Sequence, residues 1–170
     1  MSKPQLYLLV GYPGSGKTTI AKNIHEKSGA EHLWTDWERN AMFDQPTHSQ
    51  EESNRLYDYL NRLTAQLLSE GKSVIFDTSF NFRKDRDNLR LIAEDAGAET
   101  IVVWVNTPKA LSKTRALHGG NTRNNYDQPM TDEQFERIAH HLEEPIDNEK
   151  VIKIDGTNVD KDALIKQLSL

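Results

Sequence analysis

Eight residues near the start of the chain have the types and spacing of a phosphate-binding loop. Residues 11–18 read Gly-Tyr-Pro-Gly-Ser-Gly-Lys-Thr and fit the pattern G-x-x-x-x-G-K-[ST] at every fixed position. Glycines there let the backbone adopt positive φ angles and approach a ligand closely, so that its N–H groups converge on an anion. Lys17 would reach the β- and γ-phosphates of a nucleotide, and the Thr18 hydroxyl would lie on Mg²⁺. We expect the phosphates to be bound by Gly11, Pro13, Gly14, Ser15, Gly16, Lys17, Thr18 and Thr19.

Asp77 is a candidate ligand for the metal. It closes the apolar run 73–76, where phosphate-loop enzymes carry the acidic residue that holds the Mg²⁺ shell. A single aspartate at the end of a strand also serves as a turn or helix-capping residue. Because a phosphate loop is present, we favour the first interpretation and expect Thr18 and Asp77 to form the metal site.

Asp36 and Arg39 form a third candidate group, three positions apart. In a helix their side chains would point the same way. An aspartate there can accept the proton of an attacking hydroxyl or align it, and an arginine can hold an anionic group of the acceptor with its planar fork. The alternative is an exposed ion pair without function. Trp34 and Trp37 either line an acceptor pocket beside this pair or take part in ordinary packing.

A polar segment rich in glycine and asparagine, at about residues 116–131, has the composition of a mobile lid. Arg115 precedes the most polar part of this segment and Arg123 lies inside it. Closure of such a lid would expel water and bring positive charge onto a transferring phosphoryl group. The alternative for each arginine is simple solvation at the surface.

Basic and acidic side chains alternate over residues 83–90. This mixture predicts a solvated helix face. Arg83 and Arg86 would nevertheless be close enough to Asp77 to touch a substrate.

The candidate residues depend on strands and helices that alternate along the chain. Apolar runs predict the strands, and apolar residues at helical spacing predict the helices between them. Strands that are apolar on both faces indicate an α/β domain around a parallel sheet, whose ligands bind beyond the carboxyl ends of the strands. The phosphate loop, Asp36 and Asp77 would therefore share one rim. The predicted strands are 6–10, 32–35, 73–76, 100–105 and 151–154, and the predicted helices are 18–27, 49–71, 83–96, one from 107, 131–142 and 161–168.

Several helix boundaries are marked by capping residues. Ser49 with Glu52, and Thr131 with Gln134, have the spacing of a capping box. Thr107 precedes a proline, as the N-cap of the next helix would. The apolar stripe of the helix from Ser49 is predicted to be Leu56, Tyr59, Leu60, Leu63 and Leu67.

Composition narrows the class of protein. The chain has 170 residues, a formal net charge of −5 at pH 7 and no cysteine. This length predicts a single domain over residues 1–170. The acidic balance argues against a general affinity for nucleic acid, and the lack of cysteine excludes disulfides and thiolate metal sites. No stretch is long and apolar enough for a membrane span and no signal peptide is evident, so we expect a cytoplasmic protein.

With these residues the chain resembles the small P-loop kinase group that includes polynucleotide 5′-hydroxyl kinases, zeta-toxin-like kinases and gluconate-kinase-like enzymes. The resemblance covers nearly the whole chain and is most specific at residues 11–18, 35–39, 74–81 and 115–123. It implies a P-loop NTPase fold, with a five-stranded parallel sheet, helices on both faces and a mobile lid. ATP is the implied phosphoryl donor, and Mg²⁺ the implied cofactor.

The resemblance also implies roles for single residues. In polynucleotide kinases the matching aspartate is the general base toward the 5′-hydroxyl and the matching arginine contacts the acceptor's phosphate, so these roles fall on Asp36 and Arg39. The lid arginine that engages the donor phosphates falls on Arg115 or Arg123, and the sequence does not choose between them. The group's Asp-Ala-Thr-Asn stretch is here Asp-Thr-Ser-Phe-Asn over residues 77–81, one residue longer.

The resulting hypothesis is a kinase that transfers the γ-phosphoryl group of ATP to a hydroxyl of a small molecule or of a nucleic-acid 5′ end. The acidic chain favours a small molecule. A nucleotide-dependent ATPase or switch, or a regulatory module without a hydroxyl acceptor, is the alternative. GTPase-type switches would carry Asp-x-x-Gly and Asn-Lys-x-Asp, and neither occurs. A nucleoside-monophosphate kinase is less favoured, because the Asp-Gly-[FY]-Pro-Arg stretch of those enzymes is missing.

Overall fold

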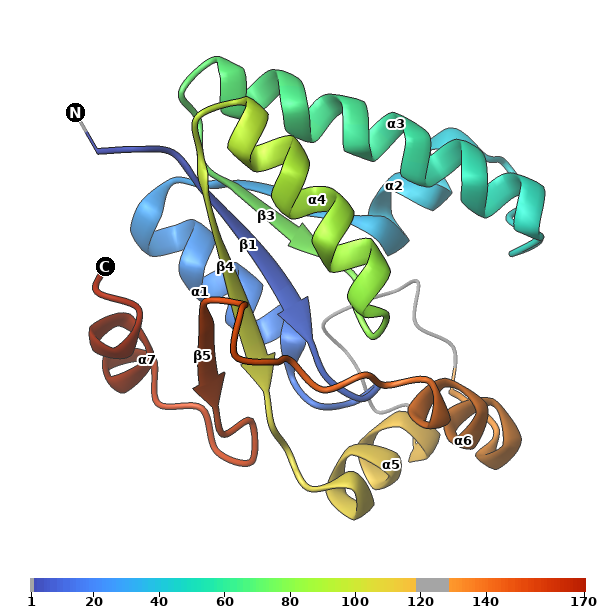
Figure 1. Cartoon of the computed structure of the whole chain (residues 1–170). Helices are drawn as coiled ribbons and strands as arrows, with labels where there is room; N and C mark the ends of the chain where they lie inside the picture. The colour runs from blue at the N-terminus through green and yellow to red at the C-terminus, as the bar shows by residue number, and fades with distance from the viewer. Residues whose placement is uncertain (1, 119–128) are drawn as a thin grey trace.

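A parallel five-stranded sheet organises the chain, as predicted. The computed structural model describes residues 2–118 and 129–170. The strands lie in the order β2-β3-β1-β4-β5, and every neighbouring pair is parallel (Figure 1). All five strands fall within one residue of the predicted ranges at each end. They are β1 (Gln5–Val10), β2 (Glu31–Trp34), β3 (Val74–Asp77), β4 (Glu99–Val105) and β5 (Val151–Ile154).

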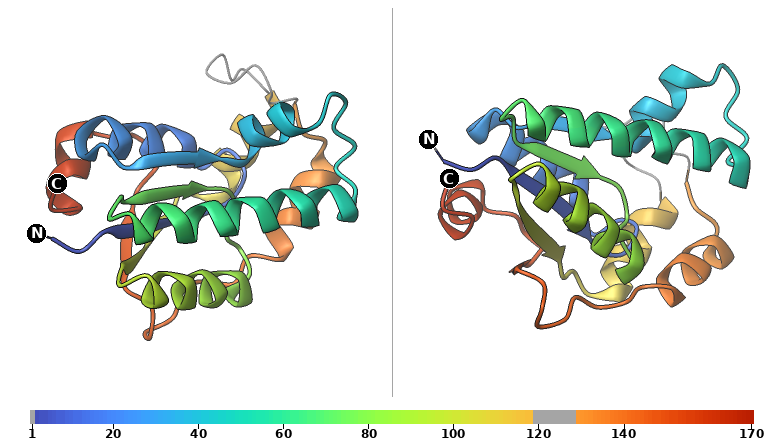
Figure 2. Two further views of the ribbon diagram at one scale, coloured as in Figure 1. Left: turned by 90° about the horizontal axis from the view of Figure 1, so that it is seen from above. Right: turned by 45° about the horizontal axis from the view of Figure 1, so that its top comes forward.

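Helices cover both faces of the sheet. Helices α1 and α7 pack together on one face, whereas α3 and α4 cover the other (Figure 2). The short helix α2 follows β2 directly, and α5 and α6 lie beyond the carboxyl ends of the strands (Figure 1). The helices are α1 (Lys17–Ser28), α2 (Thr35–Met42), α3 (Gln50–Ser69), α4 (Arg83–Asp95), α5 (Lys109–His118), α6 (Asp132–His140) and α7 (Lys161–Gln167).

The central strand β1 supplies both hydrophobic cores. Leu6 and Leu8 belong to the core under α3 and α4, while Tyr7 and Leu9 belong to the core under α1. This division follows from the pleat, because successive side chains of a strand point to opposite faces. A strand buried on both faces must be apolar at every position, which is the pattern read from the sequence.

Side chains cap the first turns of α3, α6 and α7, and two of the predicted caps depart from expectation. Thr131 and Gln134 form the predicted capping box of α6. Ser49 caps α3 by accepting from the Glu52 backbone N–H at 3.2 Å, but the Glu52 carboxylate turns to other partners, so the box is half formed. The predicted N-cap Thr107 lies before α5 and instead donates its hydroxyl to the Ser15 carbonyl oxygen at 2.7 Å.

The two helices that flank the predicted lid are joined at its base. Lys113 on α5 bridges Asp132 at 2.7 Å and Glu136 at 2.8 Å on α6. The Met130 backbone N–H donates to the Ala116 carbonyl oxygen at 3.1 Å. Most of the lid prediction, at residues 116–131, falls on 119–128 and so lies outside the described residues.

No helix in the described part of the chain is both long enough and apolar enough to cross a membrane.

Candidate active site

Three segments, each following a strand, meet at the carboxyl edge of the sheet. The phosphate loop follows β1, α2 follows β2, and the segment from Thr78 follows β3. Trp34 and Asp77 are register partners in the β2–β3 pair, so Asp36 and Asp77 lie at the same edge. The parallel sheet thus brings the predicted loop and both predicted aspartates to one rim, as expected for ligand sites in α/β sheets.

The phosphate loop leads directly into α1. Gly14 and Gly16 have φ angles of 80° and 109°, in the left-handed region that glycine adopts without strain. Lys17, the first residue of α1, donates through Nζ to the carbonyl oxygens of Gly11 at 3.0 Å and Tyr12 at 2.8 Å. Its ammonium group therefore lies across the loop, at the positive end of the helix dipole, where an anion is favoured.

Helix α5 lies directly against this loop. A Cβ on Gly14 would collide with the carbonyl oxygen of Ser112, so only glycine fits there. Arg115 donates to the carbonyl oxygens of Gly156 and Thr157, both at 2.9 Å. Arg115 thus lies between the phosphate loop and the segment after β5.

The second lid candidate, Arg123, lies outside the described residues.

Asp77 lies at the end of β3 with a buried side chain, 3 % exposed. His32 Nε2 lies 2.8 Å from Asp77 Oδ2, and the Thr35 hydroxyl donates to the Asp77 carbonyl oxygen at 3.2 Å. The histidine contact was not predicted, although His32 and Trp34 alternate along β2 and so share the face on which Asp77 lies. A carboxylate held in this way at the rim suits Mg²⁺, which prefers oxygen ligands.

No cluster of three or more metal-ligating side chains occurs among residues 2–118 and 129–170. Mg²⁺ is commonly bound through one or two carboxylates together with substrate phosphates. Asp77 and the Thr18 hydroxyl at the start of α1 fit that mode of binding.

Arg39 is committed to a buried ion pair. The stretch after β2 is helical, so Asp36 and Arg39 lie on one side of α2 as predicted. Arg39 is 8 % exposed, and it donates to Glu52 Oε1 at 2.6 Å and to the Ser53 hydroxyl at 3.1 Å. The Thr47 backbone N–H, helped by Arg39 and the His48 N–H, lowers the pKa of Glu52 to about 2 despite its burial. Arg39 therefore joins α2 to the start of α3.

Tyr57 on α3 lies near this pair. Its hydroxyl lies 2.8 Å from the Thr78 hydroxyl in the loop after β3. Burial raises the Tyr57 pKa, and the nearby charges of Arg39, Asp36 and Asp85 also act on it. The apolar periodicity of α3 predicted Tyr59 in the buried stripe, but Tyr59 is 42 % exposed.

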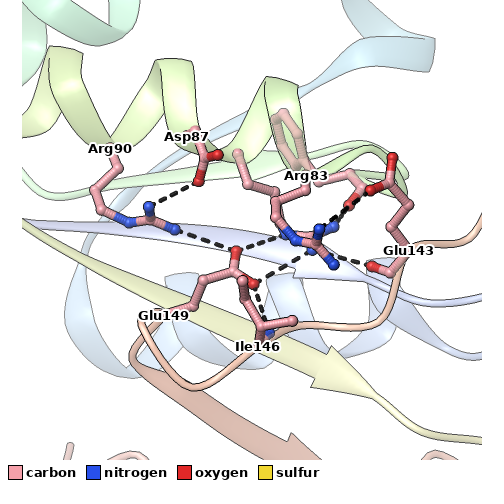
Figure 3. Close-up of polar contacts among 8 residues, drawn as sticks. Arg83, Asp87, Arg90, Glu143, Ile146 and Glu149 are labelled. Atoms are coloured by element: carbon pink, nitrogen blue, oxygen red, sulfur yellow. Dashed lines mark hydrogen bonds and ion pairs between the residues drawn. The ribbon is translucent and has the colours of Figure 1, made fainter.

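The prediction that Arg86 belongs to a solvated helix face, near enough to touch substrate, is wrong. Arg86 is fully buried and donates to Glu149 Oε1 at 2.7 Å and to the carbonyl oxygens of Phe80 at 2.6 Å and Glu143 at 3.0 Å. Glu149 also accepts from Arg90 and from the Ile146 N–H (Figure 3). This network holds α4, the loop after β3 and the segment before β5 together.

The parallel sheet and the glycine loop after β1 define a P-loop NTPase fold. The model of the AAA_33 family, an AAA domain, matches residues 6–145, and the chain belongs to this family. Among curated protein sequences, none matches the chain.

Several solved structures share the whole fold. A Chloroflexus aurantiacus protein provisionally described as a kinase has a TM-score of 0.75 at 20% identity, covering 99% of this chain and 98% of that one. Mycobacterium tuberculosis APS kinase CysC, in complex with AMPPNP and APS, has a TM-score of 0.69 at 17% identity, covering 100% of both chains. A gluconokinase from Sinorhizobium meliloti has a TM-score of 0.67 at 16% identity, covering 98% of this chain and 90% of that one. At these identities the likeness establishes the fold.

Proposed function

We propose that this protein is an ATP-dependent kinase that transfers a γ-phosphoryl group to the hydroxyl of an acceptor. The observation that supports it best is the shared rim. A phosphate loop, the candidate metal ligand Asp77 and the candidate base Asp36 follow three neighbouring strands of one parallel sheet. Phosphoryl transfer asks little covalent chemistry of the protein and depends on alignment and charge neutralisation. A donor site beside an acceptor site at one edge meets that requirement.

Each part of the rim has a role in this reaction. Lys17 would leave the loop carbonyl oxygens for the β- and γ-phosphates of ATP. Thr18 and Asp77 would hold Mg²⁺, which supplies charge neutralisation on the phosphate oxygens when bound. Arg115, beside the loop, would engage the donor nucleotide, and Arg123 remains the second candidate for the donor phosphates.

Asp36 would act on the acceptor. Its carboxylate would align the attacking hydroxyl and accept its proton as the new oxygen–phosphorus bond forms. The bond between the γ-phosphorus and the bridging oxygen breaks, and ADP leaves with that oxygen. Asp36 lies in the first turn of α2, so its backbone is fixed by the helix.

Transfer of labelled phosphate from [γ-³²P]ATP to a panel of hydroxyl acceptors tests this function. We expect label on an acceptor, with Asp36→Asn and Lys17→Ala each lowering transfer by about 10²-fold or more. ATP binding should survive Asp36→Asn. Asp44→Asn and Lys27→Ala change exposed residues of the same types and serve as controls.

The alternative function, a nucleotide-dependent ATPase or switch, predicts a different result. Label would then appear only as inorganic phosphate, whatever the acceptor. Hydrolysis would also be unaffected by Asp36→Asn while Lys17→Ala abolished it. That combination would refute the kinase assignment.

A further inference from the structure

One oxygen of the candidate metal ligand Asp77 is held by a histidine from the neighbouring strand. His32 Nε2 lies 2.8 Å from Asp77 Oδ2, and the two side chains are 14 % and 3 % exposed. Resting on the kinase function proposed above, we infer that His32 is a positioning residue for the nucleotide-bound Mg²⁺. It fixes the Asp77 carboxylate so that the other oxygen, Oδ1, is directed to the metal or to a water on it. His32 acts only through Asp77.

The main chain of Asp77 is already fixed by the sheet. Strand β3 lies between β2 and β1, and the Thr35 hydroxyl donates to the Asp77 carbonyl oxygen at 3.2 Å. The sheet leaves the carboxylate free to rotate about its side-chain bonds. An ionised carboxylate only accepts hydrogen bonds, so the hydrogen in the contact with His32 belongs to Nε2. This N–H holds Oδ2 and thereby sets the direction of Oδ1.

The imidazole ring of His32 is itself packed against aromatic neighbours. It stacks on the Trp34 ring, with centroids 6.0 Å apart and an interplanar angle of 13°. The centroid of the His25 ring lies 6.5 Å away, and His25 Nδ1 lies 2.7 Å from the Ala30 carbonyl oxygen. Ring pairs at these separations stabilise one another. The imidazole is therefore held in one orientation and can fix the carboxylate that it contacts.

One side of α1 links this pair to the phosphate loop. Thr18, Lys22 and His25 are four and three residues apart, the spacing that places side chains on one side of a helix. Lys22 Nζ lies 5.4 Å from the centroid of the Trp34 ring, and His25 packs against the imidazole described above. This side of α1 therefore lies over β2, with Thr18 one turn nearer the carboxyl edge than Lys22. Thr18 is thus brought to the edge where Asp77 lies.

Mg²⁺ is sensitive to the orientation of its ligands. It takes oxygen ligands in near-ideal octahedral geometry, and imidazole suits other metals better, so His32 is not expected to bind it directly. Groups that orient a metal ligand typically contribute about 10- to 100-fold to metal affinity or activity. A histidine–aspartate pair with only a structural role would stabilise the fold and leave the affinity for the metal unchanged.

The test measures how strongly Mg²⁺ acts on nucleotide binding. The Kd for AMPPNP is determined by calorimetry with excess Mg²⁺ and again in EDTA. The ratio of the Kd in EDTA to the Kd in Mg²⁺ isolates the metal, because the phosphate loop contributes to both values. We expect His32→Leu and Asp77→Asn each to lower this ratio by about tenfold or more, with little change of the Kd in EDTA.

Two further variants serve as controls. His32→Gln keeps an N–H donor the same number of bonds from the backbone as Nε2, so it should keep the ratio within about threefold of the wild type. His140→Leu removes an exposed histidine of α6 and should leave the ratio unchanged. Urea denaturation of every variant measures the structural contribution separately.

The double variant His32→Leu/Asp77→Asn shows whether His32 acts through Asp77. We expect its ratio to equal that of Asp77→Asn alone, because the charged ligand that His32 positions is then missing. This comparison also decides the question if His32→Leu, which leaves the buried Asp77 carboxylate without its partner, does not fold.

Three results would overturn the inference. A ratio for His32→Leu within about twofold of the wild type would show that the pair only supports the fold. A wild-type ratio for Asp77→Asn would remove the metal ligand itself, and a double variant below Asp77→Asn would mean that His32 acts by another route. None of these measurements depends on phosphoryl transfer. Absence of transfer to every acceptor, with the ratios as expected, would count against the kinase function and support the role of His32.

Discussion

The Glu52 carboxylate holds the N-terminus of α3 in place, because it accepts hydrogen bonds from three different residues. Its carboxylate accepts from Arg39 on α2 and from the Thr47 and His48 N–H groups before α3. In the predicted capping box this carboxylate would instead have accepted a hydrogen bond from the backbone N–H of the N-cap residue, Ser49. The tertiary contact with Arg39 and the loop N–H groups takes its place. At this position one side chain therefore holds the α2–α3 connection in place and neutralises the buried Arg39 guanidinium.

The depressed pKa of Glu52 makes stability depend on acidity. The folded pKa is about 2, against an ordinary value of 4.5. The ionised carboxylate therefore stabilises the fold fully above pH 4.5, and this stabilisation is lost as the pH falls toward 2. Glu52→Gln should be less stable than the wild type near neutral pH and should lose less stability on acidification through that window. Urea unfolding at several pH values measures both.

A second carboxylate, that of Glu136, also titrates in this pH range and contributes to the measured pH dependence of stability. The Lys113 and Lys109 ammonium groups lower its pKa to about 2 as well. Both proteins share this titration, so the difference between them isolates Glu52. Equal pH profiles for Glu52→Gln and the wild type would contradict the prediction. Glu51→Gln should follow the wild-type profile.

At the scale of elements, the phosphate loop and α5 form one packed unit. The collision expected at Gly14 is with the backbone of α5, which cannot move as a side chain can. Gly14→Ala should therefore raise the Kd for ATP by about tenfold or more. Gly29 also has a positive φ, of 74°, but has nothing within 4 Å of an added Cβ. Gly29→Ala should cost about 1 kcal/mol of stability and leave the Kd unchanged, as denaturation and calorimetry would measure. Equal Kd values for the two variants would refute the packing argument.

Helix α4 is tied to the segment before β5 by the Arg86–Glu149 pair. Arg86→Met leaves a buried carboxylate without its main partner, so it should lower the free energy of unfolding by about 3–5 kcal/mol. The double variant Arg86→Met/Glu149→Leu removes both buried charges and should recover part of that loss. Urea denaturation of the two variants measures the difference. A double variant less stable than Arg86→Met alone would contradict this account.

The sequence predicted those elements whose patterns are local. The apolar run of β1, the glycine loop after it and the Thr131 capping box each occupy a few adjacent residues, and each was confirmed. Pairings between distant segments were missed. Arg86 and Glu149 are 63 positions apart, and nothing around either residue indicates the other. Arg39 was predicted to contact the acceptor and Glu52 to complete a capping box. Their pairing was missed because the identity of a charged residue does not reveal which distant residue it pairs with.

Tyr57 and Tyr59 show a second limit of periodicity. Helix α3 packs on the sheet with one side and also meets the loop after β3 with a neighbouring side. The predicted apolar stripe, which includes Leu56 and Leu60, describes only the side of α3 that packs on the sheet. Tyr57 faces the second, where its hydroxyl meets Thr78. When a helix also packs against a loop at the candidate site, its buried residues extend beyond a single apolar stripe.

At the scale of the whole molecule, the two hydrophobic cores share the central strand. Leu8 packs into one core and Leu9 into the other, so neither core is expected to survive loss of β1. We predict that residues 1–170 unfold as one cooperative unit. Urea unfolding followed by fluorescence, which reports on Trp34 in β2, Trp37 in α2 and Trp104 in β4, should coincide with unfolding followed by circular dichroism.

Nucleotide binding should stabilise this unit as a whole. The phosphate loop contacts β1, α1, α5 and the segment after β5, so ATP bound there is linked to both cores. With Mg²⁺ and ATP at 100 times the Kd, the free energy of unfolding should rise by about 2.7 kcal/mol in both signals. Lys17→Ala, which weakens ATP binding, should lose most of this gain, whereas the exposed Lys27→Ala should keep it. Separate midpoints for the two signals, or a shift in only one of them, would show that the chain contains more than one folding unit.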